Sequence, residues 1–472
     1  MNLDDRLAEA GQAHLAEALA RLDGAARDRL RAQVEALDLD LIGRLVGELV
    51  GAGGPPELGR IEPLAPADVI LLPRSEADRA REREAAAAGA RALAEGRVGA
   101  ALLAGGQGTR LGFDGPKGAF PFAPITGRPL FAHHAATMAA LRERYGAPIP
   151  WYILTSPQND AATRGFFAEH GHFGLDPASV RFVVQGTLPA VDREDGAILL
   201  EAPDRLALSP DGHGGLLSAL RASGALDEME AAGVRTVFTF QVDNPLLPVC
   251  RPDVIGHHVG AGADMSSMVV RKLAPEEKMG VIARIDGRTG VVEYSDLPGE
   301  LAEERDADGE LVYWAGSIAV HCIEVGFVRE LTEGGLRLPY HRALKRVPHV
   351  GDAGRAVDPD EPNAVKFETF LFDALPSARR SVTVEARRED TFSPIKNAEG
   401  ADSPATARRD LNRLYARWLE AAGVSVPRDR DGEPVDLEVD PRFALDADEL
   451  ARRLPAGLAV TGPTVIPPAA TP

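Results

Sequence analysis

A glycine-rich loop that carries two cations is the part of the sequence best suited to chemistry. Residues 102–118 read LLAGGQGTRLGFDGPKG. The glycines let the backbone approach a polyanion and direct N–H groups toward it. Arg110 can hold phosphate oxygens bidentately, and Lys117 can neutralise a second phosphate as a point charge. These residue types favour a phosphate-binding loop over a loop that only reverses the chain.

Two common phosphate-loop patterns do not fit this stretch. A dinucleotide fingerprint needs G-x-G-x-x-G, but Leu111 stands where the third glycine should follow Gly106 and Gly108. The Walker pattern needs G-x-x-x-x-G-K-[ST], which residues 112–117 do not satisfy. What remains is a long loop after a buried strand, and ligands of open parallel sheets bind at the carboxyl ends of strands.

Lysine is scarce in this chain, which makes each lysine informative. Of the 52 basic residues only six are lysines, namely Lys117, Lys272, Lys278, Lys345, Lys366 and Lys396. A lysine that persists in such a chain can mark a place where a compact ammonium fits and a planar guanidinium does not. Chance retention is the alternative explanation for any one of them.

The elements predicted around the loop alternate between strands and helices. Buried strands are predicted at 98–106, 149–157, 180–186 and 236–244, and helices at about 76–95, 130–144 and 160–170. This spacing predicts an α/β fold with a doubly wound, mostly parallel, Rossmann-like sheet. After Asp264, MSSMVVRK and a hairpin turning at DGRTG (286–290) predict an antiparallel insertion beside the main sheet.

The two ends of the chain differ from the middle in their pattern of residues. Leu15, Leu19, Leu22 and Leu30 are spaced for one helical face within residues 1–50, and GAGGPPELG (51–59) interrupts that pattern. A helix starting near Ala407 leads into a proline-rich tail with an end expected to be flexible. We therefore predict an N-terminal helical region (1–96), a catalytic domain (97–400) and a small C-terminal domain with a flexible tail (401–472).

The overall composition narrows the classes of partner. The formal charge of −19 argues against nonspecific nucleic-acid binding, which needs a net basic surface. Cys250 and Cys322 have neither zinc-ligand spacing nor the pattern of a disulfide framework. The N-terminus lacks the basic start and apolar run of a signal peptide, and no window approaches a membrane span. We expect a cytoplasmic protein that binds no nucleic acid and no membrane.

Ordered motifs over roughly residues 98–400 resemble one enzyme family. They are AGGQGTRLG with PKG, QGTLPAV (185–191), SPDGHGG (209–215), QVDNPLL (241–247), MGVIARIDG (279–287), VVEYSD (291–296), AGSIAVH (315–321), PNAVKFETFLFD (362–373) and REDTFSPIKNA (388–398). The chain is identified by them as similar to the sugar-phosphate uridylyltransferases, in particular the UDP-N-acetylhexosamine pyrophosphorylases. The resemblance implies a nucleotide-diphospho-sugar transferase fold and the conversion of UTP and a sugar 1-phosphate into a UDP-sugar and pyrophosphate.

The resemblance also implies roles on the nucleotide side. Arg110 and Lys117 match residues on the leaving pyrophosphate, and Lys396 matches a second lysine near the α-phosphate and the sugar phosphate. Gln185 and Gly212 match positions that read uracil. Other implied nucleotide-binding positions are Leu103, Ala104, Gly105, Gly106, Gly108, Thr109 and Asp243. Such chemistry depends on positioning and charge stabilisation more than on a general base.

A metal site and a sugar site are implied as well. Asp243 follows the predicted strand TVFTFQVD, and one or two carboxylates plus phosphates suit Mg²⁺; an aspartate capping a strand-to-loop turn is the alternative. Residues matched to the sugar side are His213, Gly280, Glu293, Tyr294, Ser317, Lys366, Phe370 and Phe372. For Glu293 and Tyr294 the alternative is an ordinary cross-strand pair, and alternating aromatics such as Phe370 and Phe372 are often core residues.

Two departures from the family pattern concern the choice of sugar. His213 stands in a turn where the N-acetylhexosamine enzymes usually carry asparagine, and G-H-G looks more like the UDP-glucose and broad UDP-sugar branches. Ser317 likewise replaces a typical asparagine. We expect N-acetylglucosamine 1-phosphate as substrate, with glucose 1-phosphate, a broad sugar range or a noncatalytic UDP-sugar binder as alternatives. We expect a monomer or a weak homo-oligomer.

Other candidate features are given structural roles. The adjacent pairs His133-His134 and His257-His258 point in different directions and make poor metal sites, so core or solvated histidines are expected. Ser218 and Ser266 lack a G-x-S-x-G context, which gives a hydrolase little support.

Overall fold

Two compact units make up the computed structural model, which describes residues 2–50, 59–351 and 354–469. The smaller unit comprises Met1–Leu58, Gln185–Ser218 and Arg337–Asp373, and the larger comprises Gly59–Val184, Ala219–Leu336 and Ala374–Pro472. Most of the break predicted at 51–59 lies outside the described residues.

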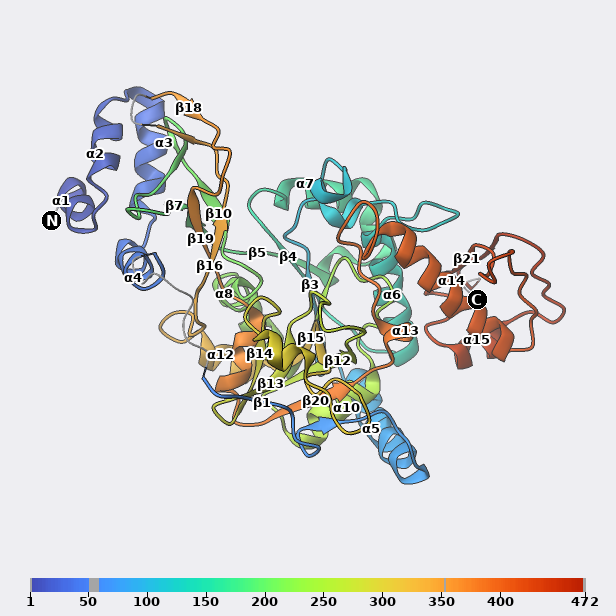
Figure 1. The fold of residues 1–472 in the computed structure, drawn as a ribbon. Coiled ribbons are helices and arrows are strands. Elements are labelled where there is room, and N and C mark those ends of the chain that lie inside the picture. The colour runs from blue at the N-terminus through green and yellow to red at the C-terminus, as the bar shows by residue number, and fades with distance from the viewer. Residues whose placement is uncertain (1, 51–58, 352–353, 470–472) are drawn as a thin grey trace. The chain divides into compact units, whose positions relative to one another are not determined.

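A large, mostly parallel sheet forms the centre of the larger unit (Figure 1). Its main path runs β2-β20-β12-β15-β11-β3-β4-β5, and β1, β13 and β14 lie off this path. The strands are β1 (Ile61–Glu62), β2 (Val69–Ile70), β3 (Val98–Leu103), β4 (Trp151–Thr155), β5 (Val180–Val184), β11 (Thr236–Gln241), β12 (Met265–Arg271), β13 (Val281–Ile285), β14 (Arg288–Val292), β15 (Ala315–Glu324) and β20 (Ser381–Glu385). The predicted α/β fold with a mostly parallel sheet is confirmed.

The antiparallel part of the sheet lies partly elsewhere than predicted. The hairpin β13–β14 forms as expected, with its turn at Asp286 and Gly287. Residues 265–271, however, form β12 inside the main sheet, parallel to β20 and antiparallel to β15. β15 also pairs antiparallel with β11 and so joins two parallel halves. An apolar run such as MSSMVV is typical of any strand buried on both faces, and its register partners cannot be read from the sequence.

Helices of the larger unit include those predicted beside the strands. They are α5 (Glu76–Ala94), α6 (Leu130–Tyr145), α7 (Asp160–Glu169), α9 (Ala225–Ala231), α10 (Pro252–Ala261), α11 (Gly299–Glu303), α12 (Val325–Leu331), α13 (Arg388–Thr391), α14 (Pro404–Ala421) and α15 (Ala447–Arg453). α5 and α10 cross in close contact, because a Cβ atom added at Gly89 would lie 1.8 Å from the Pro252 carbonyl oxygen. Glycine is required at this crossing.

The C-terminal residues build a small subassembly of α14, α15 and the strands β21 (Leu437–Val439) and β22 (Thr464–Ile466), which pair in parallel. Ser403 caps α14 in a capping box. An ion pair from Arg128 to the buried Asp440 (2.6 Å) ties the subassembly to the chain before α6. β22 therefore gives regular structure to part of the tail expected to be flexible, while residues 470–472 lie outside the described residues.

In its described residues, the smaller unit begins with the helices α1 (Leu3–Glu9), α2 (Ala13–Ala20), α3 (Gly24–Glu35) and α4 (Leu39–Leu49). Leu15, Leu19 and Leu30 are buried as their spacing predicts, and Leu22 is partly buried against them. Its short strands are β6 (Thr187–Pro189), β7 (Val191–Asp192), β8 (Leu200–Ala202), β9 (Arg205–Leu206), β10 (Leu208–Pro210), β16 (His341–Lys345), β17 (His349–Val350), β18 (Ala356–Val357) and β19 (Ala364–Glu368). α8 (Gly215–Ala222) begins in this unit and ends in the larger one.

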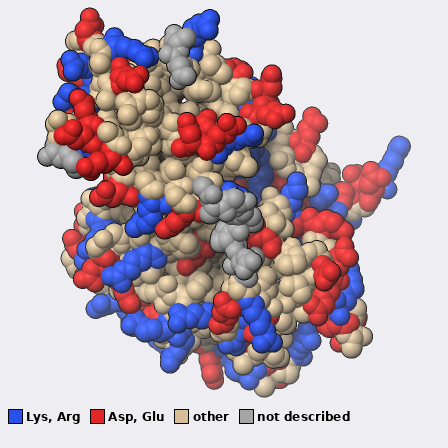
Figure 2. All heavy atoms as spheres, turned by 60° about the vertical axis from the view of Figure 1, so that its left-hand side comes forward, with Lys and Arg blue, Asp and Glu red and all other residues tan. Residues whose placement is uncertain are grey.

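The charged surface and the apolarity of the helices can be described directly. Figure 2 shows both acidic and basic side chains distributed over the visible face. None of the helices in the described part of the chain has the length and apolarity to cross a membrane.

Candidate active site

The glycine-rich loop follows β3 and closes on itself. Gly108 N–H donates to the Gly115 carbonyl (2.9 Å), and Phe113 N–H donates to the Gly108 carbonyl (3.1 Å). Lys117 N–H donates to the Gly106 carbonyl (3.2 Å), which closes the base of the loop. A Cβ atom at Gly108 would lie 2.8 Å from the Phe113 ring, so only glycine fits there. The loop is a fixed structure rather than a loose connection.

The nucleotide-binding positions implied by the resemblance differ in their exposure to solvent. Leu103 and Ala104 are buried, so a ligand could meet only their backbone. Gly105 is partly exposed, whereas Gly106, Thr109 and Arg110 are exposed. Thr109 and Arg110 lie in the short 3₁₀ turn Thr109–Leu111. The part of the loop that a solvent-borne anion can reach therefore carries the Arg110 guanidinium.

A buried asparagine that sequence reasoning missed holds the start of this loop. The Asn159 amide donates to the carbonyl oxygens of Ala104 (2.8 Å) and Gly106 (3.2 Å). Its own oxygen accepts from Ser156 N–H (2.8 Å). Asn159 thus orients two loop carbonyls, and peptide planarity orients the N–H groups that follow them.

Lys117 and Asp243 form an ion pair beyond the carboxyl ends of β3 and β11. Lys117 Nζ lies 2.6 Å from Asp243 Oδ2, and the two side chains are 16% and 8% exposed. β3 and β11 are neighbours in parallel register, so both residues follow their strands at the same edge of the sheet. The structure therefore brings these two sequence-predicted site residues together.

Two buried histidines hold the loop that carries Asp243. His134 Nε2 lies 3.0 Å from the Val242 carbonyl oxygen, and His133 Nε2 lies 3.1 Å from that of Pro245. Burial lowers the pKa of His134 to about 4 and that of His133 well below its usual value. Both rings are therefore neutral at pH 7 and donate from Nε2. The pair is a core feature, as expected, and it fixes the backbone on both sides of Asp243.

The segment that leads to Lys396 is tied to the residue after Asp243. The Asn244 amide donates to the Thr391 carbonyl (2.8 Å), and Ser393 N–H donates to Asn244 Oδ1 (3.1 Å). Ile395 N–H donates to the Asp243 carbonyl (2.8 Å). Lys396 is therefore one residue beyond a direct contact with Asp243.

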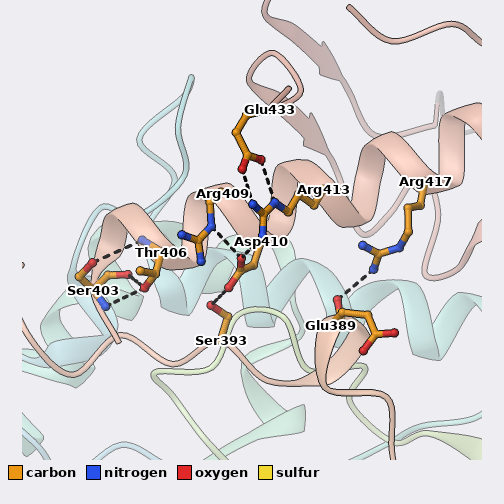
Figure 3. A network of polar contacts seen from close by, with 9 residues as sticks. All are labelled: Glu389, Ser393, Ser403, Thr406, Arg409, Asp410, Arg413, Arg417 and Glu433. Carbon is orange, nitrogen blue, oxygen red and sulfur yellow. Dashed lines mark hydrogen bonds and ion pairs between the residues drawn. The ribbon is translucent and has the colours of Figure 1, made fainter. Parts of the chain in front are cut away.

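A polar network on α14 anchors the same segment from the other side (Figure 3). Ser393 Oγ donates to Asp410 (2.8 Å), and Arg417 donates to the Glu389 carbonyl (2.9 Å). Arg409 and Arg413 both pair with Asp410. The backbone before Lys396 is thus held at both faces.

Lys396 itself begins a tight loop. Its N–H donates to the Asp402 carbonyl (2.6 Å), and its Nζ lies 3.7 Å from Asp402 Oδ2. The ammonium also lies 5.7 Å from the centre of the Phe392 ring, and the side chain is 38% exposed. Lys396 is accessible to a ligand, and its backbone is fixed.

Several residues matched to the sugar side meet beside the β13–β14 hairpin. Ser317 N–H donates to the Gly280 carbonyl (2.8 Å). A Cβ atom at Gly280 would lie 3.0 Å from Glu293 Oε1, so the carboxylate lies against this glycine. Glu293 is partly exposed and Tyr294 is 49% exposed, immediately after β14. They lie in the turn after the hairpin and not opposite each other across it.

In the smaller unit, Gln185 and Gly212 lie beside Asp211. The Gln185 amide donates to Asp211 Oδ1 and to the Gly212 carbonyl, both at 3.5 Å. Gly212 has φ +85, and a Cβ atom there would lie 2.4 Å from the Thr369 carbonyl oxygen. Burial raises the pKa of Asp211 to about 7, since Gly186 and Gly215 lie directly against its carboxyl group.

His213 belongs to an aromatic cluster of the same unit. Its Nδ1 accepts from Leu371 N–H (3.0 Å), and its ring stacks on Phe370 at 5.3 Å between centroids. Phe372 lies 5.6 Å away in an edge contact. Burial, aided by the charge of His341, lowers the pKa of His213 to about 4. The His213 ring is therefore neutral at pH 7, and its Nδ1 is already used as an acceptor for the Leu371 N–H.

Lys366 lies on β19, opposite Ala343 of β16, and is partly buried. Burial lowers its pKa, while Glu368 on the same face of the strand opposes that effect. Phe370 and Phe372 follow β19, and Phe372 is nearly fully buried. In the aromatic cluster, Phe372 is therefore a core residue, whereas part of the Phe370 ring is accessible.

The donor set suits a magnesium ion held mainly by a nucleotide. Within the described ranges no three His, Cys, Asp or Glu side chains gather as a complete metal cage. Asp243 offers one carboxylate, already charge-balanced by Lys117. Mg²⁺ keeps several waters and commonly takes one or two carboxylates plus phosphates, so this site fits it.

Two of the missed residues lie within the family motifs, and the third lies directly before a predicted helix. Asn244 lies in QVDNPLL, Asp211 in SPDGHGG, and Asn159 in SPQND at the start of α7. Their importance comes from hydrogen bonds to residues distant in the sequence. Asp211 bonds a residue 26 positions away, Asn159 one 53 positions away, and Asn244 one 149 positions away. Such partners cannot be read from spacing.

Comparisons with known proteins identify the family. The sequence profile of the family described as UTP–glucose-1-phosphate uridylyltransferase matches residues 68–402. The human UDP-N-acetylhexosamine pyrophosphorylase-like protein 1 is 40% identical over 89% of this chain and 85% of its own. The Saccharomyces cerevisiae UDP-N-acetylglucosamine pyrophosphorylase is 35% identical over 79% of each chain.

A solved structure extends the likeness to the fold. The uridine diphosphate N-acetylglucosamine pyrophosphorylase of Trypanosoma brucei, crystallised with an inhibitor, matches with a TM-score of 0.81 and 28% identity. The match covers 96% of this chain and 95% of that one. Profile, identity and coverage together show that the chain belongs to the UTP–glucose-1-phosphate uridylyltransferase family.

Proposed function

We propose that this protein makes UDP-N-acetylglucosamine and pyrophosphate from UTP and N-acetylglucosamine 1-phosphate. The observation that carries the proposal is the meeting of Lys117, Asp243 and the Lys396 segment beyond β3 and β11. The relatives named above as N-acetylhexosamine and N-acetylglucosamine pyrophosphorylases support this choice of reaction and sugar.

Electrostatic positioning by this chain's own cations is the proposed basis of the chemistry. A phosphate oxygen of the sugar 1-phosphate attacks the α-phosphorus of UTP, the bond to the β-phosphate oxygen breaks, and pyrophosphate leaves. Arg110 and Lys117 neutralise the leaving pyrophosphate, and Lys396 neutralises the α-phosphate and the incoming phosphate. Negative charge on the phosphoryl oxygens is thereby stabilised where it develops.

Backbone groups of the glycine loop complete the triphosphate site. We assign this role to Leu103, Ala104, Gly105, Gly106, Gly108 and Thr109, the first two through the backbone alone. Asp243 would hold Mg²⁺, which when bound supplies neutralising charge and an orienting template for the phosphates. With metal and nucleotide bound, the phosphates would replace the Asp243 carboxylate as the partner of Lys117.

Gln185 and Gly212 are proposed to recognise uracil. The Gln185 amide nitrogen donates to Asp211 Oδ1 and to the Gly212 carbonyl oxygen, so its NH₂ group faces these two acceptors. The amide oxygen is then left to accept from the uracil N3–H.

Sugar-side roles remain proposals for Gly280, Glu293, Tyr294 and Ser317 in the larger unit. The same holds for His213, Lys366, Phe370 and Phe372 in the smaller unit. A carboxylate such as that of Glu293 accepts hydrogen bonds from sugar hydroxyls. The Ser317 side chain is short, and a glucosyl acceptor stays the second candidate on that account.

A pyrophosphate-release assay tests both the reaction and the sugar. Purified chain, UTP and Mg²⁺ are combined with the 1-phosphates of N-acetylglucosamine, N-acetylgalactosamine, glucose and galactose. We expect the highest kcat/KM with N-acetylglucosamine 1-phosphate and a loss of at least about 100-fold for Lys117→Ala and Lys396→Ala. Arg79→Ala removes an exposed positive charge on α5 and serves as the control. Pyrophosphate release that both lysine variants leave unchanged would contradict the proposal.

A further inference from the structure

We propose that Asn244 is a positioning residue that places Lys396 for the transfer step. This inference rests on the proposed function, because it assigns Asn244 an effect only through Lys396. Asn244 is 3% exposed and directly follows Asp243, so its side chain faces protein rather than solvent or ligand.

The contacts of Asn244 are specific to the segment before Lys396. Its amide nitrogen donates to the Thr391 carbonyl, and its oxygen accepts from Ser393 N–H. Donor and acceptor of one side chain are thus satisfied by two residues of a single short segment. No other residue type of this size offers a donor and an acceptor in this arrangement, because aspartate has no donor and leucine has neither.

The loop that carries Asp243 is also held by side chains other than Asn244. His134 holds the Val242 carbonyl and His133 holds the Pro245 carbonyl, on either side of Asp243. Loss of the Asn244 side chain should therefore loosen residues 391–395 and leave the Asp243 carboxylate in place.

The segment would still be attached after that loss, but less tightly. Ser393 Oγ remains bonded to Asp410, and Ile395 N–H to the Asp243 carbonyl. We therefore expect a folded variant whose Lys396 ammonium is misplaced. A displacement of about 1 Å at a reacting centre can cost on the order of 100-fold in rate.

Asn412 provides a matched control in the same unit. It is also buried, at 6% exposed, donates to Asp436 Oδ1 (2.9 Å) and accepts from Leu437 N–H (2.9 Å). Asn412 thus ties α14 to the start of β21, and neither of these two hydrogen bonds goes to residues 391–396. Asn412→Ala removes the same two kinds of hydrogen bond without touching the segment before Lys396.

The experiment compares Asn244→Ala, Asn412→Ala, Lys396→Ala and the double variant Asn244→Ala/Lys396→Ala with the unaltered chain. Each is measured for kcat and KM in pyrophosphate release, for UTP affinity by calorimetry, and for melting temperature. Asn244→Asp is included because it keeps the acceptor for Ser393 but turns a second acceptor toward the Thr391 carbonyl. It covers the case in which Asn244→Ala fails to fold.

We expect kcat to fall by about 10- to 100-fold in both Asn244 variants, with UTP affinity within about 2-fold of the unaltered chain. Asn412→Ala should keep full kcat at a similar melting temperature. The double variant should be no slower than Lys396→Ala alone. Asn244 acts only through Lys396, so its loss has no further effect on kcat once the lysine is absent.

Three results would overturn the inference, and they differ from failure of the proposed function. Unchanged kcat in Asn244→Ala or in Asn244→Asp would do so, as would a double variant whose losses multiply. An equal loss of kcat in Asn412→Ala would show a general effect of fold damage. An unaltered chain that releases no pyrophosphate from any sugar 1-phosphate would overturn the proposed function itself, and this inference with it.

Discussion

The Lys117–Asp243 ion pair allows a quantitative test of how charge is arranged at the base of the glycine loop. Asp243→Asn and Lys117→Met each remove one charge with little change in volume. In the absence of metal and nucleotide, either change leaves the other charge nearly buried and without its partner, whereas the double change removes both. The three variants and the unaltered chain form a double-mutant cycle.

The size of the effect follows from the burial of the pair. Two unit charges about 4 Å apart attract by about 4 kcal/mol at an effective dielectric constant of about 20. Removing one partner of a buried pair costs about 3–5 kcal/mol, since the remaining charge has lost water and gained nothing. Replacing both charges can be nearly neutral. We expect about 3 kcal/mol of destabilisation for each single variant and a double variant that is at least about 2 kcal/mol more stable than additivity predicts.

Tryptophan fluorescence during urea unfolding is the appropriate assay. Trp151, Trp314 and Trp418 are the three tryptophans of the chain, and all lie in the larger unit together with the ion pair. The signal therefore reports unfolding of that unit. Chelator is present throughout, so that no divalent ion takes the place of Lys117.

An exposed pair in the same unit is the control. Arg79 Nε lies 2.9 Å from Glu76 Oε2 on α5, with side chains 50% and 70% exposed. Exposed ion pairs on a helix surface contribute little to stability, because water and salt screen them. Coupling between Lys117 and Asp243 that is no larger than in this control would refute the reasoning, because it would mean that the pair is solvated rather than buried.

Three further predictions concern protonation, sugar choice and thiol chemistry. The folded chain keeps the Asp211 proton up to about pH 7, whereas an unfolded carboxyl releases it near 3.8, so stability falls as pH rises between these values. Asp211→Asn cannot ionise, and its stability relative to the unaltered chain should rise by up to about 4 kcal/mol from pH 4 to pH 8 in calorimetry; a constant difference would contradict the assignment. Ser317→Asn should raise the preference for N-acetylglucosamine 1-phosphate over glucose 1-phosphate by about 5- to 20-fold in kcat/KM, because a longer amide can bond a sugar substituent; an unchanged ratio would place residue 317 away from the sugar. Cys250 and Cys322 are fully buried with raised thiol pKa, so a thiol reagent should label neither in the folded chain and both in denaturant; rapid labelling without denaturant would show that the core opens.

Local patterns determine the elements that the sequence predicts well. The run VGAALL is apolar and continuous and forms β3, buried along its whole length. Glu76–Ala94 and Leu130–Tyr145 show helical composition without internal proline, and both form helices close to the predicted bounds. Motif order was sufficient for the family, because each motif is short, local and specific. The predicted domain boundaries remain a prediction.

Pairing between distant segments is where the sequence alone was insufficient. The run MSSMVV is compatible with an insertion or with a central strand, and only pairing with β15 and β20 places it in the main sheet. The protonation of Asp211 also depends on distant segments, because burial beside Gly186 and Gly215 raises its pKa. These are properties of an environment that several segments create together.

The sequence by itself determined the family and the mostly parallel α/β fold, and it predicts which cations a triphosphate would need. Residue type and local spacing carry that information. Only the tertiary structure decided that Lys117 is paired with Asp243, that two histidines brace the Asp243 loop, and that Asn244 holds the segment before Lys396. The physical reason is that hydrogen bonds and ion pairs act over about 3 Å in space, whatever the separation along the chain.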